Sequence, residues 1–460
     1  MHSMVSSLGR LAIAVAIVAS AATAVFAQQT VRVPEDQGTI QAGINAAGDG
    51  DTVSIAAGTY SGSGNRDIVL NGRNIVVRAR DGGGVLIDVG GPFTTGNGHR
   101  GVSFINGDTS QFIGITIRNG HMRGDADGGG IRVSESSPSI SDCVIEDCQA
   151  AGRGGGVYVV DHSGAVLDNC QILSNWAGGA GAGVGNGGGV ACFDTSFVLL
   201  LDCTISGNTA DNDGGGIWGK DTAEIMATGC IISGNECTVA GSGGSGGALY
   251  LKGANSIASI SHCFIFANES APGTGGQTQS RGGGLLVDQS EVTLTNCVLN
   301  DNVAGSATAQ GGAAHVLGGG ELIVLSCTLV DNVTNGSGGG ALYANGSGGS
   351  TLAVRNTILW EYDDGEGTTG QIVVVNNPTL FVSNSCVEDW NENNGNITGD
   401  DDDPELGTDQ TTGLVFRITG DSSCWNAGDN SWVSWSQEID HATRIQNGTV
   451  DIGADEVFSE

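Results

Sequence analysis

The two lysines of the chain, Lys220 and Lys252, each follow an aromatic residue by two positions, in "GIWGK" and "ALYLK". Aromatic rings stack on sugar rings, and cations beside them suit carboxylates or sulfates. This combination indicates a carbohydrate-binding surface. Neighbouring ammonium groups would also lower each other's pKa, as a general base requires. Lys220 and Lys252 are therefore also the candidate catalytic residues of a polysaccharide lyase or hydrolase.

The aromatic residues before the lysines occupy a position that recurs along the chain. Each follows a glycine run and one aliphatic residue, as in "GGGVYV" and "GGALYL". Alternation at period two indicates a β-strand whose aliphatic residue points inward and whose next residue points outward. The alternative is that these aromatic residues reflect strand propensity and packing between neighbouring strands. The predicted ligand-binding face comprises Arg132, Tyr158, Trp218, Lys220, Tyr250, Lys252 and Tyr343.

Acidic turns are the candidate metal sites. Asp125 and Asp127 lie in "GDADGGG", Asp211 and Asp213 lie in "DNDGGG", and Asp400–Asp403 lie in "GDDDDPE". Ca²⁺ binds six to eight oxygen ligands, so two carboxylates on one turn are too few alone. The alternative is that these are solvated turn residues. Ca²⁺ is the one cofactor that the sequence indicates.

A repeated phrase sets the fold. "LDCTISGN", "TGCIISGN" and "SHCFIFAN" each place an aliphatic residue two positions after a cysteine and an asparagine five positions after it. The phrase recurs about every 30 residues, with short strands, glycine-rich turns and no amphipathic helix between repeats, which is typical of a parallel β-helix. We therefore predict an all-β fold, a single solenoid of about ten coils.

Equivalent residues of stacked coils lie about 4.8 Å apart. At this spacing an asparagine amide can donate to one neighbour and accept from the other, and asparagine tolerates the left-handed conformation of a bend. We predict an internal asparagine ladder, made of Asn175, Asn208, Asn235, Asn268, Asn302 and Asn332.

The aligned cysteines are spaced too widely for relaxed disulfide bonds, whose Cβ atoms lie about 3.5–4.5 Å apart. We predict that they form a buried row of mainly free thiols, which continues more weakly at Asn356 and Cys386. Four cysteines outside the row, Cys148, Cys192, Cys237 and Cys424, are freer to pair. The predicted row comprises Cys143, Cys170, Cys203, Cys230, Cys263, Cys297 and Cys327.

The two ends and the composition limit the function. Residues 1–27 are predicted to be a signal peptide, because an apolar run follows Arg10 and ends in small residues. We assign 28–98 to an N-terminal cap with a short helix and the first coils, 99–398 to the repeats and 399–460 to a C-terminal capping or tail region. The formal charge of −33 argues against nucleic-acid binding. We expect a monomer that is secreted or held at the cell surface, with no transmembrane segment after the signal peptide is removed.

"VPEDQGTIQAGINAAGDGDTVSIAAGTY" resembles the cap and first coil of the pectin-lyase-like superfamily, which includes pectin methylesterases. The "GGGI", "GGAL" and "IxxN" phrases are similar to repeats of chlamydial polymorphic outer-membrane proteins. "SSCWNAGDN" followed by "VDIGADE" looks like the tail of choice-of-anchor surface proteins. These resemblances imply a right-handed parallel β-helix that is exported. The catalytic phrases of the superfamily's pectin-degrading enzymes are missing.

From these observations we expect an exported, non-enzymatic β-helix protein. It would bind carbohydrate or cell-envelope material along the aromatic-containing face. The alternative is a divergent polysaccharide lyase or hydrolase.

Overall fold

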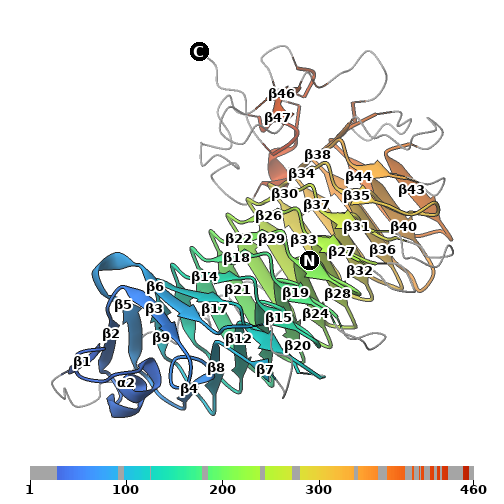
Figure 1. The fold of residues 1–460 in the computed structure, drawn as a ribbon. Helices are drawn as coiled ribbons and strands as arrows, with labels where there is room; N and C mark the ends of the chain where they lie inside the picture. The colour runs from blue at the N-terminus through green and yellow to red at the C-terminus, as the bar shows by residue number, and fades with distance from the viewer. Residues whose placement is uncertain are drawn as a thin grey trace.

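The computed structural model describes residues 28–91, 98–124, 126–178, 185–238, 244–271, 280–335, 340–360 and 370–388, and short segments between 396 and 454. The predicted signal peptide and most of the predicted C-terminal tail region lie outside the described residues. The chain winds into one elongated parallel β-solenoid of about ten turns (Figure 1). The predicted fold class is confirmed.

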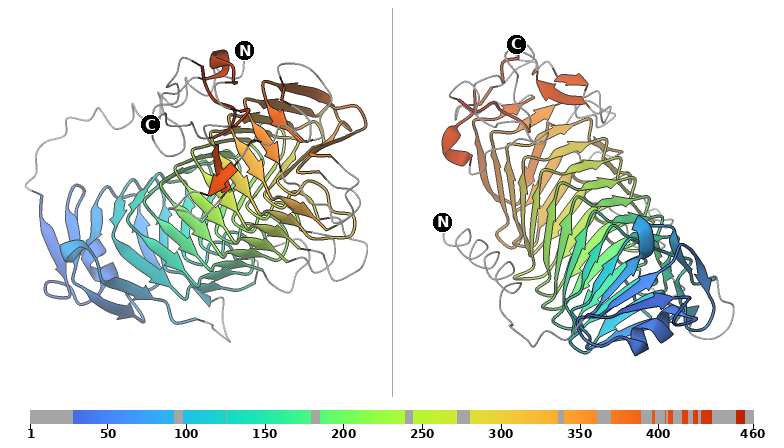
Figure 2. Two further views of the ribbon diagram at one scale, coloured as in Figure 1. Left: turned by 90° about the horizontal axis from the view of Figure 1, so that it is seen from above. Right: turned by 90° about the vertical axis from the view of Figure 1, so that its left-hand side faces the viewer.

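Three long parallel sheets run along the solenoid, and a fourth sheet of two-residue strands lies beside them (Figure 2). Sheet A contains β1 (Thr30–Val33), β2 (Thr52–Ile55), β5 (Val76–Ala79), β9 (Gln111–Ile113), β13 (Ser139–Ser141), β17 (Gly164–Asp168), β21 (Phe197–Leu201), β25 (Glu224–Thr228), β29 (Ile257–Ser261), β33 (Glu291–Thr295), β37 (Glu321–Leu325), β41 (Thr351–Arg355) and β44 (Thr379–Ser383). Sheet B contains β3 (Gly58–Ser61), β6 (Val85–Asp88), β10 (Ile115–Arg118), β14 (Val144–Glu146), β18 (Gln171–Leu173), β22 (Thr204–Ser206), β26 (Ile231–Ser233), β30 (Phe264–Phe266), β34 (Val298–Asn300), β38 (Thr328–Val330), β42 (Ile358–Trp360) and β45 (Cys386–Val387).

Sheet C carries the predicted ligand-binding face. It contains β4 (Ile68–Asn71), β8 (Val102–Ile105), β12 (Ile131–Ser134), β16 (Val157–Val160), β20 (Val190–Phe193), β24 (Ile217–Lys220), β28 (Leu249–Lys252), β32 (Leu285–Asp288), β36 (Ala314–Leu317), β40 (Leu342–Asn345) and β43 (Ile372–Val375). Sheet D contains β7 (Gly98–His99), β11 (His121–Met122), β15 (Gln149–Ala150), β19 (Trp176–Ala177), β23 (Thr209–Ala210), β27 (Glu236–Cys237), β31 (Glu269–Ser270), β35 (Val303–Ala304) and β39 (Val333–Thr334). The short strands β46 (Leu406–Thr408) and β47 (Val415–Ile418) pair with each other.

The N-terminal end of the core is covered by the helix α2 (Ile40–Ala46). Thr39 caps the helix, because its Oγ1 accepts a hydrogen bond from the Ala42 N–H at 3.2 Å. Ile40 and Ile44 are fully buried, and the helix contacts β1, β2 and β4. The other helical segments are the single turns η1 (Arg80–Gly82) and η2 (Asn430–Trp432). The predicted short helix near the N-terminus is thus confirmed.

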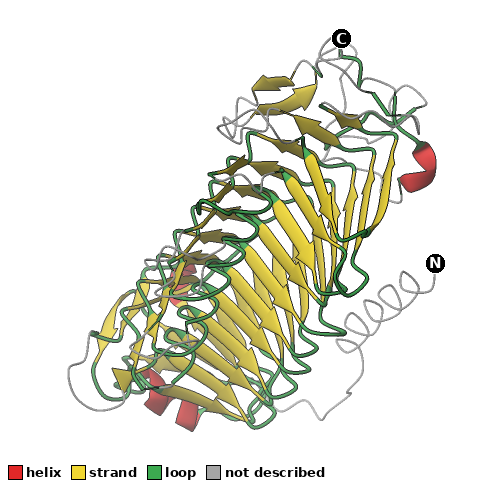
Figure 3. Cartoon of the chain, turned by 90° about the vertical axis from the view of Figure 1, so that its right-hand side faces the viewer, coloured by secondary structure: helices red, strands yellow, loops and turns green. Residues whose placement is uncertain are grey.

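The glycine runs let the chain turn tightly before each strand of sheet C (Figure 3). Gly214 has a φ of 65°, in the left-handed region that favours glycine. At Gly215 an added Cβ would lie 2.6 Å from the carbonyl oxygens of Glu236 and Gly247. A side chain at Gly215 would therefore push adjacent coils apart immediately before Ile217–Lys220.

The predicted asparagine ladder is present inside the solenoid. The Asn235 side chain donates to the Asn268 Oδ1 and to the Ile205 carbonyl, each at 2.9 Å. Its own Oδ1 accepts from the Asn208 backbone and side chain at 3.0 and 2.9 Å. The left-handed conformation that we expected at the asparagine belongs instead to the preceding residue, such as Ser174 or Ala267.

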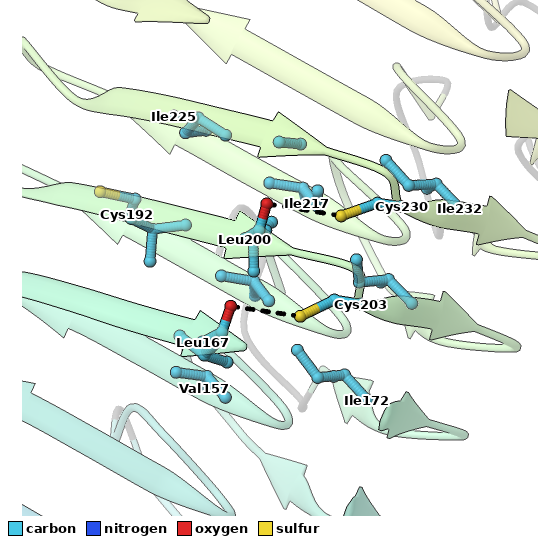
Figure 4. Close-up of a cluster of buried hydrophobic side chains, with 14 of the residues drawn as sticks. Val157, Leu167, Ile172, Cys192, Leu200, Cys203, Ile217, Ile225, Cys230 and Ile232 are labelled. Atoms are coloured by element: carbon cyan, nitrogen blue, oxygen red, sulfur yellow. Dashed lines mark hydrogen bonds between the residues drawn. The ribbon is translucent and has the colours of Figure 1, made fainter. Parts of the chain in front are cut away.

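All twelve cysteines lie within the described residues, and all are buried free thiols. The Sγ of Cys203 donates to the Leu167 carbonyl of the preceding coil at 3.4 Å, and Cys230 donates to Leu200 at 3.6 Å (Figure 4). Burial raises the pKa of Cys148 and of Cys192, both outside the row, to about 12. The thiols thus act as small core side chains with one weak donor.

The predicted continuation of the thiol row is wrong by one residue. Strand register aligns Thr328 with Ile358 and Cys386, so the next two members are Thr357 and Ser385 rather than Asn356 and Cys386. The Thr357 hydroxyl donates to the Val324 carbonyl at 3.5 Å, as the thiols do in earlier coils. This position of the coil therefore requires a small side chain that donates a hydrogen bond, and not cysteine in particular.

Replacing Asn235 by alanine should lower the free energy of unfolding by about 3 kcal/mol, because the Asn208 N–H groups lose their acceptor and the Ile205 carbonyl loses its side-chain donor. The Asn268 Oδ1 would keep only its bond from the backbone N–H of residue 235. Chemical denaturation checks this. Asn45→Ala, at an exposed position of α2, is the control and should change stability by less than about 0.5 kcal/mol. Equal effects of the two substitutions would contradict the role of the ladder.

Thiol titration of unreduced protein should find all twelve cysteines reactive after unfolding and almost none before it, because every thiol is buried. Fewer than twelve reactive thiols in denaturant would reveal disulfide bonds and overturn the free-thiol row.

Candidate ligand-binding face

Sheet C places the predicted aromatic residues in one column. Strand register aligns Tyr158 with Ala191, Ala191 with Trp218, and Trp218 with Tyr250. The column continues through His315 to Tyr343. All these side chains lie on the outer side of the sheet, since the aliphatic residues beside them fill the core.

The expectation that this column is exposed is wrong. Tyr158, Trp218, Tyr250 and Tyr343 are only 3–6% exposed. Tyr158, Trp218 and Tyr250 belong to a separate outer hydrophobic cluster, and the Arg153 guanidinium lies 5.6 Å from the Trp218 ring. Period-two alternation distinguishes the two sides of a sheet, but it does not reveal that residues of neighbouring coils cover the outer side.

The covering residues come immediately before the glycine runs. They form their own ladder of parallel β-bridges beside the column, in which Arg153, Asn186, Asp213, Ser245, Arg281 and Gln310 follow one another. Gln310 illustrates the contact, because its Nε2 donates to the Tyr343 hydroxyl at 3.1 Å. The aromatic column is therefore covered by other residues of this face and is not exposed to solvent.

A second outward column, two residues further along each strand, remains accessible. We call its central members, Phe193, Lys220, Lys252 and Asp288, the lysine row; they are aligned across β20, β24, β28 and β32. The Lys220 and Lys252 side chains are 36% and 41% exposed. Phe193 is half-buried and stacks on Trp218, with ring centroids 6.0 Å apart.

Each lysine of the row has a carboxylate beside it. The Lys220 Nζ lies 3.6 Å from Asp221, and the Lys252 Nζ lies 3.0 Å from Asp288. Asp288 is 6% exposed and also accepts a hydrogen bond from the Tyr250 hydroxyl at 3.2 Å. Lys252 is thus held by Asp288 on the next strand of the row, and its side chain remains half-exposed.

Close to Lys252 lies the half-buried carboxyl group of Asp213, a member of the covering ladder. Burial, opposed by the charges of Lys252 and Arg281, raises its pKa to about 7. Burial and the nearby charges of Asp213 and Asp288 also raise the pKa of Tyr250. The folded chain therefore brings together Lys252 and Asp213, for which the sequence suggested different roles. Asp288 and Arg281, which the sequence analysis did not identify, belong to the same group.

The sequence held a signal for Asp288 that we did not use. Asp288 occupies, in the next repeat, the same outward strand position that Lys252 occupies in its own repeat. Aligning the repeats therefore predicts that Asp288 and Lys252 are neighbours. Arg281 lies in a glycine-rich loop of variable length, and only the folded coil brings its charge near Asp213. Arg132 stands apart from both, half-exposed and 3.7 Å from Asp161.

The predicted calcium ligands do not converge. Asp211 accepts a hydrogen bond from the Trp176 indole at 2.8 Å, whereas Asp213 accepts from Asn212 at 3.0 Å. Asp127 accepts from the Arg153 backbone N–H at 2.6 Å. Asp125 and Asp400–Asp403 lie outside the described residues. Within the described part of the chain, no three His, Cys, Asp or Glu side chains are grouped as a metal site.

Another buried titratable group lies in the outer column. His315 is 1% exposed, and its ring lies 4.8 Å from that of Tyr343. Burial and the charge of Arg281 lower its pKa to about 3. His315 therefore belongs to the covered aromatic column and carries no charge at neutral pH.

Asp213→Asn should stabilise the protein at neutral pH. The Asp213 pKa is raised from 3.8 to about 7 on folding, so its ionisation opposes folding increasingly as pH rises through this window. We expect the variant to exceed wild type by up to about 4 kcal/mol at pH 8 and to match it near pH 4. Denaturation curves across this range check the prediction, and a pH-independent difference would contradict it.

Comparisons with known proteins agree with this architecture. The family model "Right handed beta helix region" matches residues 42–211 and 184–359. No curated protein sequence matches the chain. Within the described residues, no helix has the length and apolar character needed to cross a membrane.

Several solved structures are similar to this chain at low identity. They include a pectate lyase, Pel9A (15% identity, TM-score 0.49, covering 94% of this chain and 98% of that one). They also include XylC in complex with xylose (10%, 0.46, 90% and 95%) and an alginate lyase from Paenibacillus sp. str. FPU-7 (13%, 0.34, 78% and 99%). Since the family model covers more than half of the sequence, the chain belongs to the right-handed β-helix family.

Proposed function

We propose that this protein is an exported binding protein that holds a carboxylate- or sulfate-bearing polysaccharide along the lysine row. One observation carries the proposal. The only two lysines of a chain with net charge −33 stand on consecutive strands in register, both half-exposed. Equivalent residues of adjacent coils lie about 4.8 Å apart, so the two lysines are neighbours on one face, each with a carboxylate beside it.

Apolar surface beside the lysines suits a sugar ring. The Lys220 Nζ lies 6.0 Å from the Phe193 ring centroid, and Phe193 rests on the buried Trp218. A half-buried ring that is fixed from below offers a rigid platform at little cost in side-chain entropy. The buried tyrosines that we first expected to contact ligand instead support this platform.

The surrounding charge makes the site selective. Acidic polymers are repelled by most of this molecule, so an anionic ligand would be held at the lysine row and weakened by salt. Asp221, which is half-exposed beside the Lys220 ammonium group, also offers hydrogen-bond acceptors for sugar hydroxyls. Both features favour a polymer that carries hydroxyls and sparse negative charge.

Polysaccharide cleavage is the second candidate. It is favoured by Asp213, whose raised pKa would suit proton transfer at neutral pH, close to the charge of Lys252. Asp213 is itself a half-buried member of the covering ladder and already accepts a hydrogen bond from Asn212, so a substrate would have to displace this contact to use its carboxyl group. Binding without turnover is therefore our first proposal.

Lys220→Ala and Lys252→Ala should each weaken binding of an acidic glycan about tenfold, since each removes one charge-assisted hydrogen bond. A glycan array followed by calorimetry on the best ligand measures this, alongside assays for reducing ends and unsaturated products with and without Ca²⁺. Arg78→Ala, which removes an exposed positive charge from sheet A, is the matched control and should leave affinity unchanged.

Turnover that disappears in Lys252→Ala or Asp213→Asn would replace binding by cleavage. Failure of every acidic glycan to bind would overturn both candidates.

A further inference from the structure

The two ends of the solenoid are finished differently. At the N-terminal end α2 covers the core. At the other end sheets A and C finish with β44 and β43, and no strand among the described residues pairs with their outer edges. Some described C-terminal segments lie against sheet B, where Ala454 N–H donates to Thr328 at 3.1 Å, and Gly453 N–H donates to the Asn356 carbonyl at 2.9 Å. Others reach sheet A, where the Arg355 guanidinium of β41 lies 4.0 Å from the Trp432 ring centroid.

This last coil exposes apolar side chains. Phe381 on β44 is 51% exposed, and Val374 on β43 is 44% exposed. Val374 aligns with Ala344, which is fully buried, so it occupies a core position with no coil above it. Edge strands are usually protected by charged residues, yet the segment from Gly370 to Ser383 contains no charged residue.

The backbone of β44 defines which groups face outward. Thr379 N–H donates to the Ser350 carbonyl at 2.9 Å, and the Ser383 carbonyl accepts from Asn356 N–H at 3.3 Å. These residues thus face the preceding coil, and alternation places the N–H and C=O groups of Leu380 and Val382 at the open edge. Asn396 donates to the Val382 carbonyl at 3.3 Å, which leaves that oxygen a second lone pair.

We propose that β44 pairs antiparallel with β44 of a second copy of this chain, about a two-fold axis at Phe381. The sequence "TLFVS" is self-complementary in this register. Leu380 would face Val382 of the partner subunit, so both inward-pointing residues continue a core. Leu380 and Val382 would exchange backbone hydrogen bonds, and Phe381 would face its own copy in a pair without such bonds.

A second copy fits this edge better than another partner. Two chains of charge −33 repel each other, and an end-to-end contact through an uncharged coil keeps the rest of their charge far apart. The contact is isologous, so it closes at two chains. A basic partner would be drawn to the acidic sides of the solenoid rather than to this coil. The proposal replaces the expected monomer and is independent of the lysine row.

Phe381→Cys should form a disulfide-linked dimer when treated with oxidised glutathione. Cα atoms in an antiparallel pair without backbone hydrogen bonds lie about 4.5 Å apart, within the range that a disulfide spans. Non-reducing gels measure the product. Ile231→Cys, at an exposed apolar position on sheet B, is the matched control and should stay monomeric, while the native thiols are buried.

Light scattering during gel filtration provides the second measurement. Wild type should show the mass of two chains, falling to one in Phe381→Asp, while Phe266→Asp on sheet B should remain dimeric. A wild-type monomer at all concentrations, a Phe381→Asp dimer, or open-ended polymers would each overturn the proposal. Lys220→Ala should remain dimeric whether or not it binds glycan.

Discussion

The rest of this structure depends on the hydrogen bonds that hold each coil in register with the next. Backbone ladders supply most of them, and the asparagine ladder supplies the side-chain part at the bend where the backbone alone would leave carbonyls unpaired. The Asn235 amide is an example, because it forms hydrogen bonds with one backbone carbonyl and with two neighbouring asparagines within a fully buried site. Any coil that lost register would leave several buried polar groups without partners.

Register also explains what the thiols and the lysines have in common. A fixed spacing of about 4.8 Å brings identical residues close without letting them bond covalently. In the core this favours a small side chain with one donor, which cysteine, threonine and serine all provide in the row that includes Cys327, Thr357 and Ser385. On the outer side the same spacing brings Lys220 and Lys252 together, and each is accompanied by a carboxylate.

The repeats must end at both ends of the solenoid, and the two ends differ in how the core is covered. α2 closes the N-terminal end of the core, whereas the uncharged β43 and β44 leave part of the other end apolar. Between the ends, residues before the glycine runs cover the aromatic column, and Asp213 and Arg281 are among them. The charge cluster thus combines residues of the regular strands of sheet C with residues of these segments.

The sequence by itself determined the architecture, since its cysteine, asparagine and glycine positions repeat with a spacing that only stacked coils satisfy. It also determined which residues share a column, because strand register follows from that repeat. Only the tertiary structure decided which columns reach solvent. Tyr250 and Lys252 are two residues apart and point to the same side, yet Tyr250 is buried and bonded to Asp288 of the next coil, whereas Lys252 is half-exposed. The alternation of residues predicts the side of the strand on which a side chain lies, but not which other residues cover it. For the same reason, the grouping of Asp213, Lys252 and Arg281 is apparent only in the folded chain.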